Sequence, residues 1–469
     1  MSKTLIGPRL RQLRRDRSQT QAQMAKALGV SASYVNLLEN NQRSLSVQML
    51  MALSDVYGID WRELTSDESA KQVADLRNAM QDPVFGEEKP DLQEMRAAID
   101  HAPRLVDMFL RLHQSHRATL DRVMKSGSSA NQTEVWMQSS PETVLHDYFR
   151  NHSNYFSDIE AKAEQIRNEH PSEPEEHYTI LKNRLAKQHN ITVRSRPIEF
   201  MSDALRDYNV AERVIYLSQA LDHTNRVFQL AHVLCLVECD GLLRARLDRS
   251  GITHQQGLSR LQVELANYFA AAYLMPYLPF LKEAERVKYD FDRLAAAFDV
   301  SFEQVAHRVT TLQREGARGV PFFFLRVDKA GNVTKRFNST SFHLAEYGGA
   351  CPVWNIHTAF RVPGVILPQF VEMPTGERFF TISRTAHRPV FSQQTQDRRL
   401  TLTLGCALEH ADRIGYATPF NTEDQNLFSP IGINCHLCAR QACSQRAHQP
   451  IFIELPINAN RRGSTRYES

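Results

Sequence analysis

The chain has 469 residues, of which 42% are hydrophobic and 23% are charged, and its formal net charge is only +3. This length exceeds what one hydrophobic core supports, so we expect two to four domains, and the small net charge excludes a global attraction to nucleic acid. No apolar run approaches the roughly 18 residues of a membrane-spanning helix, and no apolar segment follows the basic N-terminus as in a secretory signal. We therefore expect a cytoplasmic protein whose seven cysteines stay reduced and serve more readily as metal ligands than as disulfides.

Residues 1–66 have the pattern of a helical DNA-binding domain. Six Lys and Arg side chains fall within residues 3–17, where Asp16 is the single acidic residue, and such a patch can contact phosphates. Apolar residues then recur at helical spacing on both sides of Gly29, which can end one helix, and Ser31 is a good N-cap for the next. Two helices joined through a glycine turn form a helix-turn-helix unit; a helical module that binds protein is the alternative.

The pattern from Gln21 through Gly29, Val35 and Asn40 to Leu53 resembles the phage-repressor-like (XRE) helix-turn-helix family. The resemblance implies that the helix starting near Ser31 lies in the major groove of double-stranded operator DNA, while the basic first helix holds the backbone. It implies contacts to DNA from Gln21, Ser31, Ala32, Ser33, Asn36, Leu37 and Arg43. Such domains bind two-fold related half-sites, so we expect a homodimer or homotetramer.

Residues 67–140 are predicted to be a helical linker region. The segment is amphipathic at helical spacing and is interrupted at Pro83, Pro90 and Pro103. Small polar residues crowd positions 125–134, which predicts an exposed loop before the next domain.

Two apolar segments, residues 226–238 and 263–276, predict buried helices within a mainly α-helical domain over residues 141–318. Together they resemble the ImmA/IrrE metallopeptidase family, in which the first helix carries HExxH and the second carries a Glu before an apolar run. The second helix matches from Glu264 to Pro276. The resemblance implies a scaffold of the zinc-peptidase type.

The first of these helices departs from the family pattern. It reads His232-Val233-Leu234-Cys235-Leu236, so valine replaces the catalytic Glu and leucine replaces the second His. Zinc hydrolysis needs both the ligand and the base, so we expect no enzymatic activity and a cleft left free to bind a small molecule.

Two further expectations concern the side chains of this degenerate domain. We expect His232 and Glu264 to survive as a buried hydrogen-bonded pair. Cys235 and Cys239 lie four residues apart without a third partner, and we interpret them as core thiols.

A mixed α/β domain is predicted over residues 319–469, opening with two strands around a turn in residues 321–337. Residues 346–360 (EYGGACPVWNIHTAF) and 432–447 (GINCHLCARQACSQRA) bring a wider resemblance into view. The three domains in this order resemble the short-chain fatty acyl transcriptional regulator family, which includes regulators of propionate and acetate metabolism. The resemblance spans the chain and implies a short-chain acyl-CoA as effector.

Three cysteines close to the C-terminus predict a metal or iron–sulfur site in this α/β domain. Cys435 and Cys438 have the CxxC spacing of half a tetrahedral site, and Cys443 follows closely enough to join them. Spacing alone leaves zinc and an iron–sulfur cluster open, and three unligated thiols are a further alternative; the family resemblance favours a [4Fe–4S] cluster. We predict Cys406 as the fourth ligand, with Cys351 and His436 as alternatives.

These features predict a sequence-specific transcription regulator of short-chain fatty acid metabolism. Binding of a short-chain acyl-CoA would bias a two-state oligomer and so reposition the DNA-binding domains on the operator. A redox or iron sensor without an organic ligand is the second hypothesis. A DNA-tethered zinc metallopeptidase is the third, and Val233 and Leu236 count against it.

Overall fold

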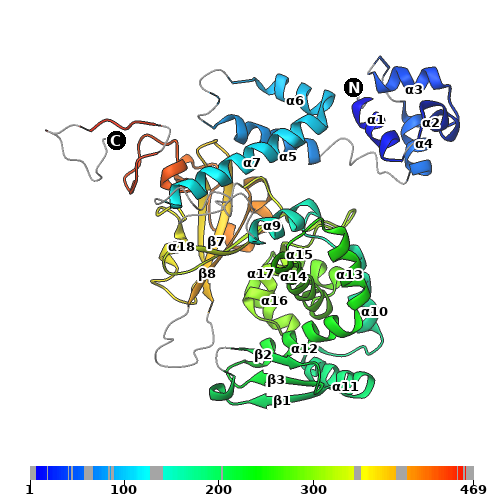
Figure 1. The fold of residues 1–469 in the computed structure, drawn as a ribbon. Helices are drawn as coiled ribbons and strands as arrows, with labels where there is room; N and C mark the ends of the chain where they lie inside the picture. Colours follow the sequence, from blue (N-terminus) through cyan, green and yellow to red (C-terminus); the bar gives the residue numbers. More distant parts are fainter. Residues whose placement is uncertain are drawn as a thin grey trace. The chain divides into compact units, whose positions relative to one another are not determined.

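The computed structural model describes residues 7–17, 19–40, 42–43, 46–57, 67–82, 85, 89–126, 141–201, 204–342, 350–386, 399–450, 453–457 and 460. The chain divides into two compact units, Met1–Gly127 and Ser128–Ser469, which are described separately (Figure 1). Among the described residues, no helix is long and apolar enough to cross a membrane.

The first unit is entirely helical within its described residues. Its helices are α1 (Gly7–Asp16), α2 (Gln21–Ala27), α3 (Ala32–Glu39), α4 (Val47–Tyr57), α5 (Asp67–Met80), α6 (Leu92–His101) and α7 (Pro103–Ser126). The first four share one core, built on Leu10, Met24, Val35, Leu38 and Leu53, and the last three share a second core. The predicted helix-turn-helix is therefore confirmed, and the described helices of the predicted linker region pack around a hydrophobic core of their own.

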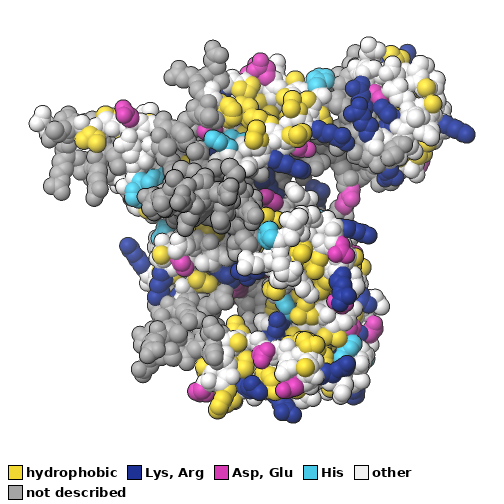
Figure 2. All heavy atoms as spheres, viewed as in Figure 1, with side chains coloured by type: hydrophobic (Ala, Val, Ile, Leu, Met, Phe, Trp, Pro, Cys, Tyr) yellow, Lys and Arg dark blue, Asp and Glu magenta, His cyan; other side chains and the backbone are white. Residues whose placement is uncertain are grey.

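Two prolines of this linker lie at or just before helix starts, because proline is tolerated there but not in the helix interior. Pro90 precedes α6, and Pro103 opens α7. Pro83 and residues 127–134 of the predicted loop lie outside the described residues. Hydrophobic side chains gather on the surface of α6 and α7 (Figure 2), where Leu105, Met108 and Leu112 are exposed at helical spacing.

The second unit begins with a helical body around a small sheet. Its helices are α9 (Pro141–Asn151), α10 (Ser157–Asn168), α11 (His177–His189), α12 (His223–Glu238), α13 (Asp240–Arg249), α14 (Gln255–Leu274), α15 (Tyr277–Arg286), α16 (Phe291–Phe298) and α17 (Phe302–Val309). Strands β1 (Thr192–Arg196), β2 (Arg206–Asn209) and β3 (Val214–Ser218) pair in the order β1-β3-β2. The two predicted buried helices are α12 and α14, which pack together, and α14 ends just before Pro276 as expected.

A six-stranded sheet follows in the same unit. It contains β4 (Phe323–Val327), β5 (Val333–Asn338), β6 (Leu367–Glu372), β7 (Arg378–Ala386), β8 (Leu400–Ala407) and β9 (Phe428–Pro430), with the short helix α18 (Asn355–Thr358) between β5 and β6. The order is β5-β4-β8-β7-β6-β9, antiparallel except for β6 and β9. The predicted opening hairpin is confirmed as β4 and β5, whose turn uses Gly331 at φ +85°.

The two faces of this sheet pack into different cores, because successive side chains of a strand point to opposite faces. Phe324, Leu402, Leu404 and Cys406 pack into one core with the helical body. The other face carries Phe323, Leu325 and Val371 into a second core with Cys351, Trp354 and Ile431. The parity of a residue along its strand therefore decides which core it joins.

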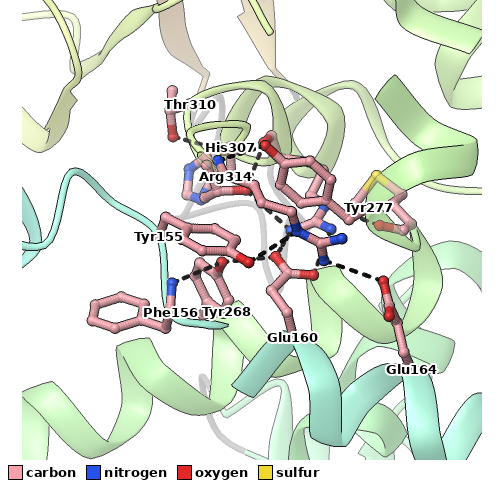
Figure 3. A network of polar contacts seen from close by, with 12 residues as sticks. Tyr155, Phe156, Glu160, Glu164, Tyr268, Tyr277, His307, Thr310 and Arg314 are labelled. Carbon is pink, nitrogen blue, oxygen red and sulfur yellow. Dashed lines mark hydrogen bonds and ion pairs between the residues drawn. The ribbon is translucent and has the colours of Figure 1, made fainter. Parts of the chain in front are cut away.

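A fully buried ion pair holds α10, α14 and α17 together. Arg308 donates to both carboxylate oxygens of Glu160, at 2.5 and 3.0 Å, and to the Met275 carbonyl oxygen at 2.9 Å. The hydroxyl of Tyr268 donates to the same carboxylate at 2.7 Å (Figure 3). Removing one partner of such a pair costs about 3–5 kcal/mol, so this network is a structural element of the helical body.

Candidate functional site

Helix α3 presents the side chains predicted to read DNA. Gly29, at φ +68°, ends the preceding helix, and the Ser31 hydroxyl caps α3 by accepting from the Tyr34 backbone N–H at 3.2 Å. Ala32 and Ser33 are exposed beside this cap. The predicted residues Ser31, Ala32, Ser33, Asn36 and Arg43 are exposed, and Leu37 is half-buried. The structure thus places Ser31, Ala32, Ser33, Asn36 and Leu37 on α3 or its N-cap and Arg43 just beyond its C-terminus, and their contacts to DNA stay a prediction.

The amide of Asn36 is oriented by a chain of hydrogen bonds with charged ends. Arg11 can only donate, and it donates to Oδ1 of Asn40 at 2.5 Å, which turns the Asn40 amide N–H towards Asn36 Oδ1 at 3.0 Å. Gln21 donates to Glu39 at 2.8 Å and to the same Asn36 oxygen at 3.3 Å. Both lone pairs of Asn36 Oδ1 are thereby engaged, so its NH₂ group is the part left to face DNA.

Glu39 is the electrostatic centre of this domain, a role that the sequence patterns did not reveal. Its side chain is fully buried, and Arg14 donates to both carboxylate oxygens at 2.6 and 3.1 Å. Burial alone would raise the pKa of Glu39, but the hydrogen bonds from Arg14 and Gln21 and the charge of Arg11 lower it overall. Gln21 and two basic residues of α1 thus position α3. The available signal was that Glu39 is the single acidic residue between Asp16 and Asp55.

The vestigial peptidase centre is built from α12, α14 and β5. His232 Nδ1 lies 2.9 Å from Oδ1 of Asn267, whose amide N–H donates to Glu264 at 3.4 Å. Lys335 of β5 donates to the same Glu264 oxygen at 2.9 Å. The expected direct pairing of His232 with Glu264 is therefore wrong, because Asn267 lies between them.

The residues at this centre do not fit a zinc ion. Val233 is fully buried and Leu236 packs against the helical core, so two positions of the family motif carry only hydrocarbon. The ammonium group of Lys335 pairs with Glu264, the remaining acidic ligand position, and a cation there opposes binding of another cation. Cys235 and Cys239 are both buried in the same core, as predicted.

The three clustered cysteines lie on the irregular segment after β9. Asn434 caps the short 3₁₀ turn Cys435–Leu437, accepting from the Leu437 N–H at 2.9 Å. Cys438 is buried, while Cys435 and Cys443 are half-buried. Arg446 donates to the carbonyl oxygens of Cys435 and Cys438, at 3.3 and 3.4 Å, which folds the segment back on itself.

Cys351 adjoins this segment, and Cys406 does not. Burial raises the pKa of the Cys351 thiol; the Gly432 backbone N–H lowers it, and the nearby thiols of Cys438 and Cys435 raise it. Gly432 also touches Cys438, since a Cβ there would lie 2.7 Å from its Sγ. Cys406 packs on the opposite face of the sheet, in the core of the helical body. This placement argues against Cys406 as the fourth ligand and favours the alternative Cys351.

His436 is otherwise engaged, because its ring stacks on His448 with centroids 4.5 Å apart. Within the described parts of the chain, no set of three or more His, Cys, Asp or Glu side chains is arranged to hold a metal ion. The thiols therefore fit a metal or cluster in chemical type and neighbourhood, and holding one requires the segment around Cys435 and Cys443 to rearrange.

Comparison with known proteins places all three regions. Residues 10–64 match the family described as Helix-turn-helix, residues 186–310 the IrrE N-terminal-like domain, and residues 311–467 the Short-chain fatty acyl coenzyme A regulator, C-terminal. A protein of Cereibacter sphaeroides described as Propionyl-CoA carboxylase regulator is 37% identical over 472 residues, covering 99% of each chain.

Two mycobacterial proteins show the same relationship. The HTH-type transcriptional regulator RamB of Mycobacterium tuberculosis is 33% identical over 472 residues, covering 98% of each chain. A solved structure described as a Mycobacterium tuberculosis transcriptional regulator is 33% identical with a TM-score of 0.67, and the match covers 71% of this chain and 100% of that one. The chain therefore belongs to the family of short-chain fatty acyl coenzyme A regulators.

Proposed function

We propose that the protein is a DNA-binding transcription regulator of short-chain fatty acid metabolism whose operator affinity responds to a short-chain acyl-CoA. The observation that carries this proposal is the end-to-end match to a relative described as Propionyl-CoA carboxylase regulator, together with the exposed reading face of α3. The DNA-binding part rests on the helix-turn-helix itself. The effector part rests on the match of residues 311–467 to the acyl coenzyme A regulator family.

At the operator, α3 enters the major groove and the basic residues of α1 contact phosphates. The NH₂ group of Asn36 donates to a base-edge acceptor, because its oxygen is already engaged by Gln21 and Asn40. The possible acceptors in the major groove are guanine O6 and N7, adenine N7 and thymine O4, whereas adenine N6 offers only a donor.

The effector acts through a two-state oligomer, as a homodimer or homotetramer. Acyl-CoA binds one state better and shifts the population, which changes the spacing of the DNA-binding domains. The exposed apolar stripe of Leu105, Met108 and Leu112 on α7 supports a self-association surface in the first unit. Sedimentation of the full-length chain against a Leu105→Glu/Leu112→Glu variant tests this surface, and an unchanged oligomer would refute it.

Operator binding in the presence of effector tests the regulatory proposal. The operator is first selected from random duplex DNA, and its affinity is then titrated with acetyl-CoA and propionyl-CoA, with free CoA as the control. A change in affinity with the acyl-CoA, absent with CoA, supports the proposal. Affinity that stays constant at millimolar acyl-CoA would contradict it.

We further propose that Cys435, Cys438, Cys443 and Cys351 hold a [4Fe–4S] cluster, with zinc as the alternative. A bound cluster supplies a redox-sensitive centre and joins the cysteine segment to Cys351 beside Gly432. Iron, zinc and acid-labile sulfide are measured on anaerobically purified protein and its Cys435→Ser variant. Zinc without sulfide would show that the cysteines hold a structural zinc ion and not a cluster. Protein that contains neither iron nor zinc would reject the site.

The second candidate is a redox or iron sensor without an organic ligand, favoured by the same thiols. Oxidation that changes operator affinity while acyl-CoA leaves it constant would select this alternative. Peptidase activity is not part of the proposal, because Val233 and Leu236 replace the base and a ligand. Cleavage of casein in the presence of zinc, lost in a Glu264→Gln variant, would overturn that reading.

A further inference from the structure

Arg206 lies half-buried at the edge of the vestigial peptidase centre, where its charge acts on His232, and no acidic partner for it is found among the described residues. Its register partner on β3 is Leu217, and paired residues of an antiparallel sheet share a face. Leu217 and Ile215 point into the core that contains α12, so the Arg206 side chain lies on the face towards that helix. Its Nη1 atom is buried, and no residue in the described ranges accepts a hydrogen bond from it.

The missing partner has an energetic consequence. Burial lowers the pKa of Arg206 to about 10, and no neighbouring carboxylate opposes that shift. Removing a cation from water without a counterion costs free energy, so a bound anion that paired with Arg206 would stabilise this region of the fold.

His232 supplies a second unsatisfied atom of opposite polarity. Glu264 accepts from the Asn267 amide N–H, so Asn267 presents its oxygen to His232 Nδ1, which must carry the proton. Burial and the charge of Arg206 lower the pKa of His232 to about 3, which keeps the ring neutral. Nε2 is therefore a buried hydrogen-bond acceptor, and none of the described residues donates to it.

The surrounding charges are otherwise balanced. Lys335 pairs with Glu264 at 2.9 Å, and Arg326, whose charge also acts on Glu264, donates to Glu303 at 2.8 Å. The side chains of Glu264 and Lys335 remain 13% and 16% exposed, so solvent reaches this end of the centre. Among the described residues of this centre, Arg206 Nη1 is left as a cationic donor and His232 Nε2 as a neutral acceptor, each without a hydrogen-bond partner.

We propose that Arg206 and His232 form a binding site for a small oxyanion that carries a hydroxyl group. The oxyanion accepts from Arg206 Nη1, and its O–H donates to His232 Nε2. Two sources share this chemistry, a hydroxycarboxylate and a phosphate that retains at least one proton. The site stands where the peptidase family binds zinc and is independent of the acyl-CoA proposal.

Equilibrium binding to the full-length protein tests the site, using calorimetric titration with glycolate, acetate and inorganic phosphate at pH 6. Acetate lacks the hydroxyl, so it should bind roughly tenfold more weakly than glycolate, because His232 Nε2 then stays unsatisfied. Phosphate that binds while glycolate does not would assign the phosphate source. Absence of binding by all three anions to the unmodified protein would overturn the proposal.

Three variants separate the site from the rest of the surface. Arg206→Met should abolish binding, His232→Phe should bring glycolate and acetate to equal affinity, and Arg194→Met, an exposed position on β1, should change neither. Without ligand, Arg206→Met should unfold at the same or higher denaturant concentration, because it removes a charge whose buried Nη1 atom has no acceptor among the described residues. Unchanged anion binding in Arg206→Met, or marked destabilisation of the ligand-free variant, would show that Arg206 has another role.

Discussion

Substituting Lys335 by methionine tests whether this lysine neutralises the carboxylate of Glu264 at the vestigial centre. Lys335 Nζ lies 2.9 Å from Glu264 Oε2, and the two side chains are only 16% and 13% exposed. The Coulomb attraction at that distance is about 6 kcal/mol for an effective dielectric constant of about 20, before desolvation is subtracted. Methionine keeps the length of the side chain and leaves Glu264 without its counterion.

The expected loss follows from the burial of the stranded carboxylate. Breaking a fully buried pair costs about 3–5 kcal/mol, and the partial exposure of both groups reduces this. We therefore expect the second unit to lose about 2–3 kcal/mol of unfolding free energy at pH 7. Because Lys335 lies on β5 and Glu264 on α14, the loss should appear in the transition of both the sheet and the helical body.

The pH dependence of the stability difference is a second, independent test of this ion pair. Burial alone would raise the pKa of Glu264, but Lys335 and Asn267 lower it below its ordinary value of 4.5. A carboxyl with a lowered folded pKa stabilises the fold above its unfolded pKa and loses that contribution as pH falls through the folded value. Without Lys335 this lowering is removed, so the difference between the two proteins should shrink as the pH is lowered from 7 to about 4.5.

Urea unfolding of the full-length chain measures these differences. Lys187→Met, an exposed lysine on α11, is the matched control and should be neutral. The double variant Lys335→Met/Glu264→Gln should recover part of the loss, since it removes the stranded charge. Stability of Lys335→Met equal to that of the parent at pH 7 would refute the inference that Lys335 stabilises the fold by neutralising Glu264.

Three further outcomes are expected. Asn36→Asp should remove the outward-facing donor and add a negative charge, so its affinity for the selected operator in a gel-shift assay should fall more than tenfold. Affinity equal to that of the parent would exclude a base contact from Asn36. Because the pKa of Glu39 is lowered in the fold, the DNA-binding domain should lose stability below about pH 4.5, a dependence that circular dichroism should find absent in Glu39→Gln. Cys351→Ser should lower bound iron or zinc while Cys406→Ser leaves it unchanged, and metal analysis showing the reverse would restore the original ligand assignment.

The sequence predicted the structure best where local patterns determine it. Gly29 and Ser31 locate the turn and cap of the recognition helix, because left-handed backbone and N-capping are properties of single residues. Val233 and Leu236 show the loss of the zinc motif directly, since neither side chain can bind a metal ion or accept a proton. The turn before β5, Ala330-Gly331-Asn332, was also predicted from the sequence, because glycine favours the left-handed backbone of such turns. Helix periodicity likewise located α12 and α14.

Only the tertiary structure shows which residues from distant parts of the sequence lie next to one another. Cys351 and Cys406 both sit in apolar stretches, and only the packing of the two sheet faces shows that the first adjoins the cysteine segment and the second the helical body. The pairing of Lys335 with Glu264 spans 71 residues, and only the folded chain shows that Arg206 Nη1 has no acceptor among the described residues. Periodicity states which side chains share a face, but the partner of that face depends on chain folding over long separations, which no local pattern encodes.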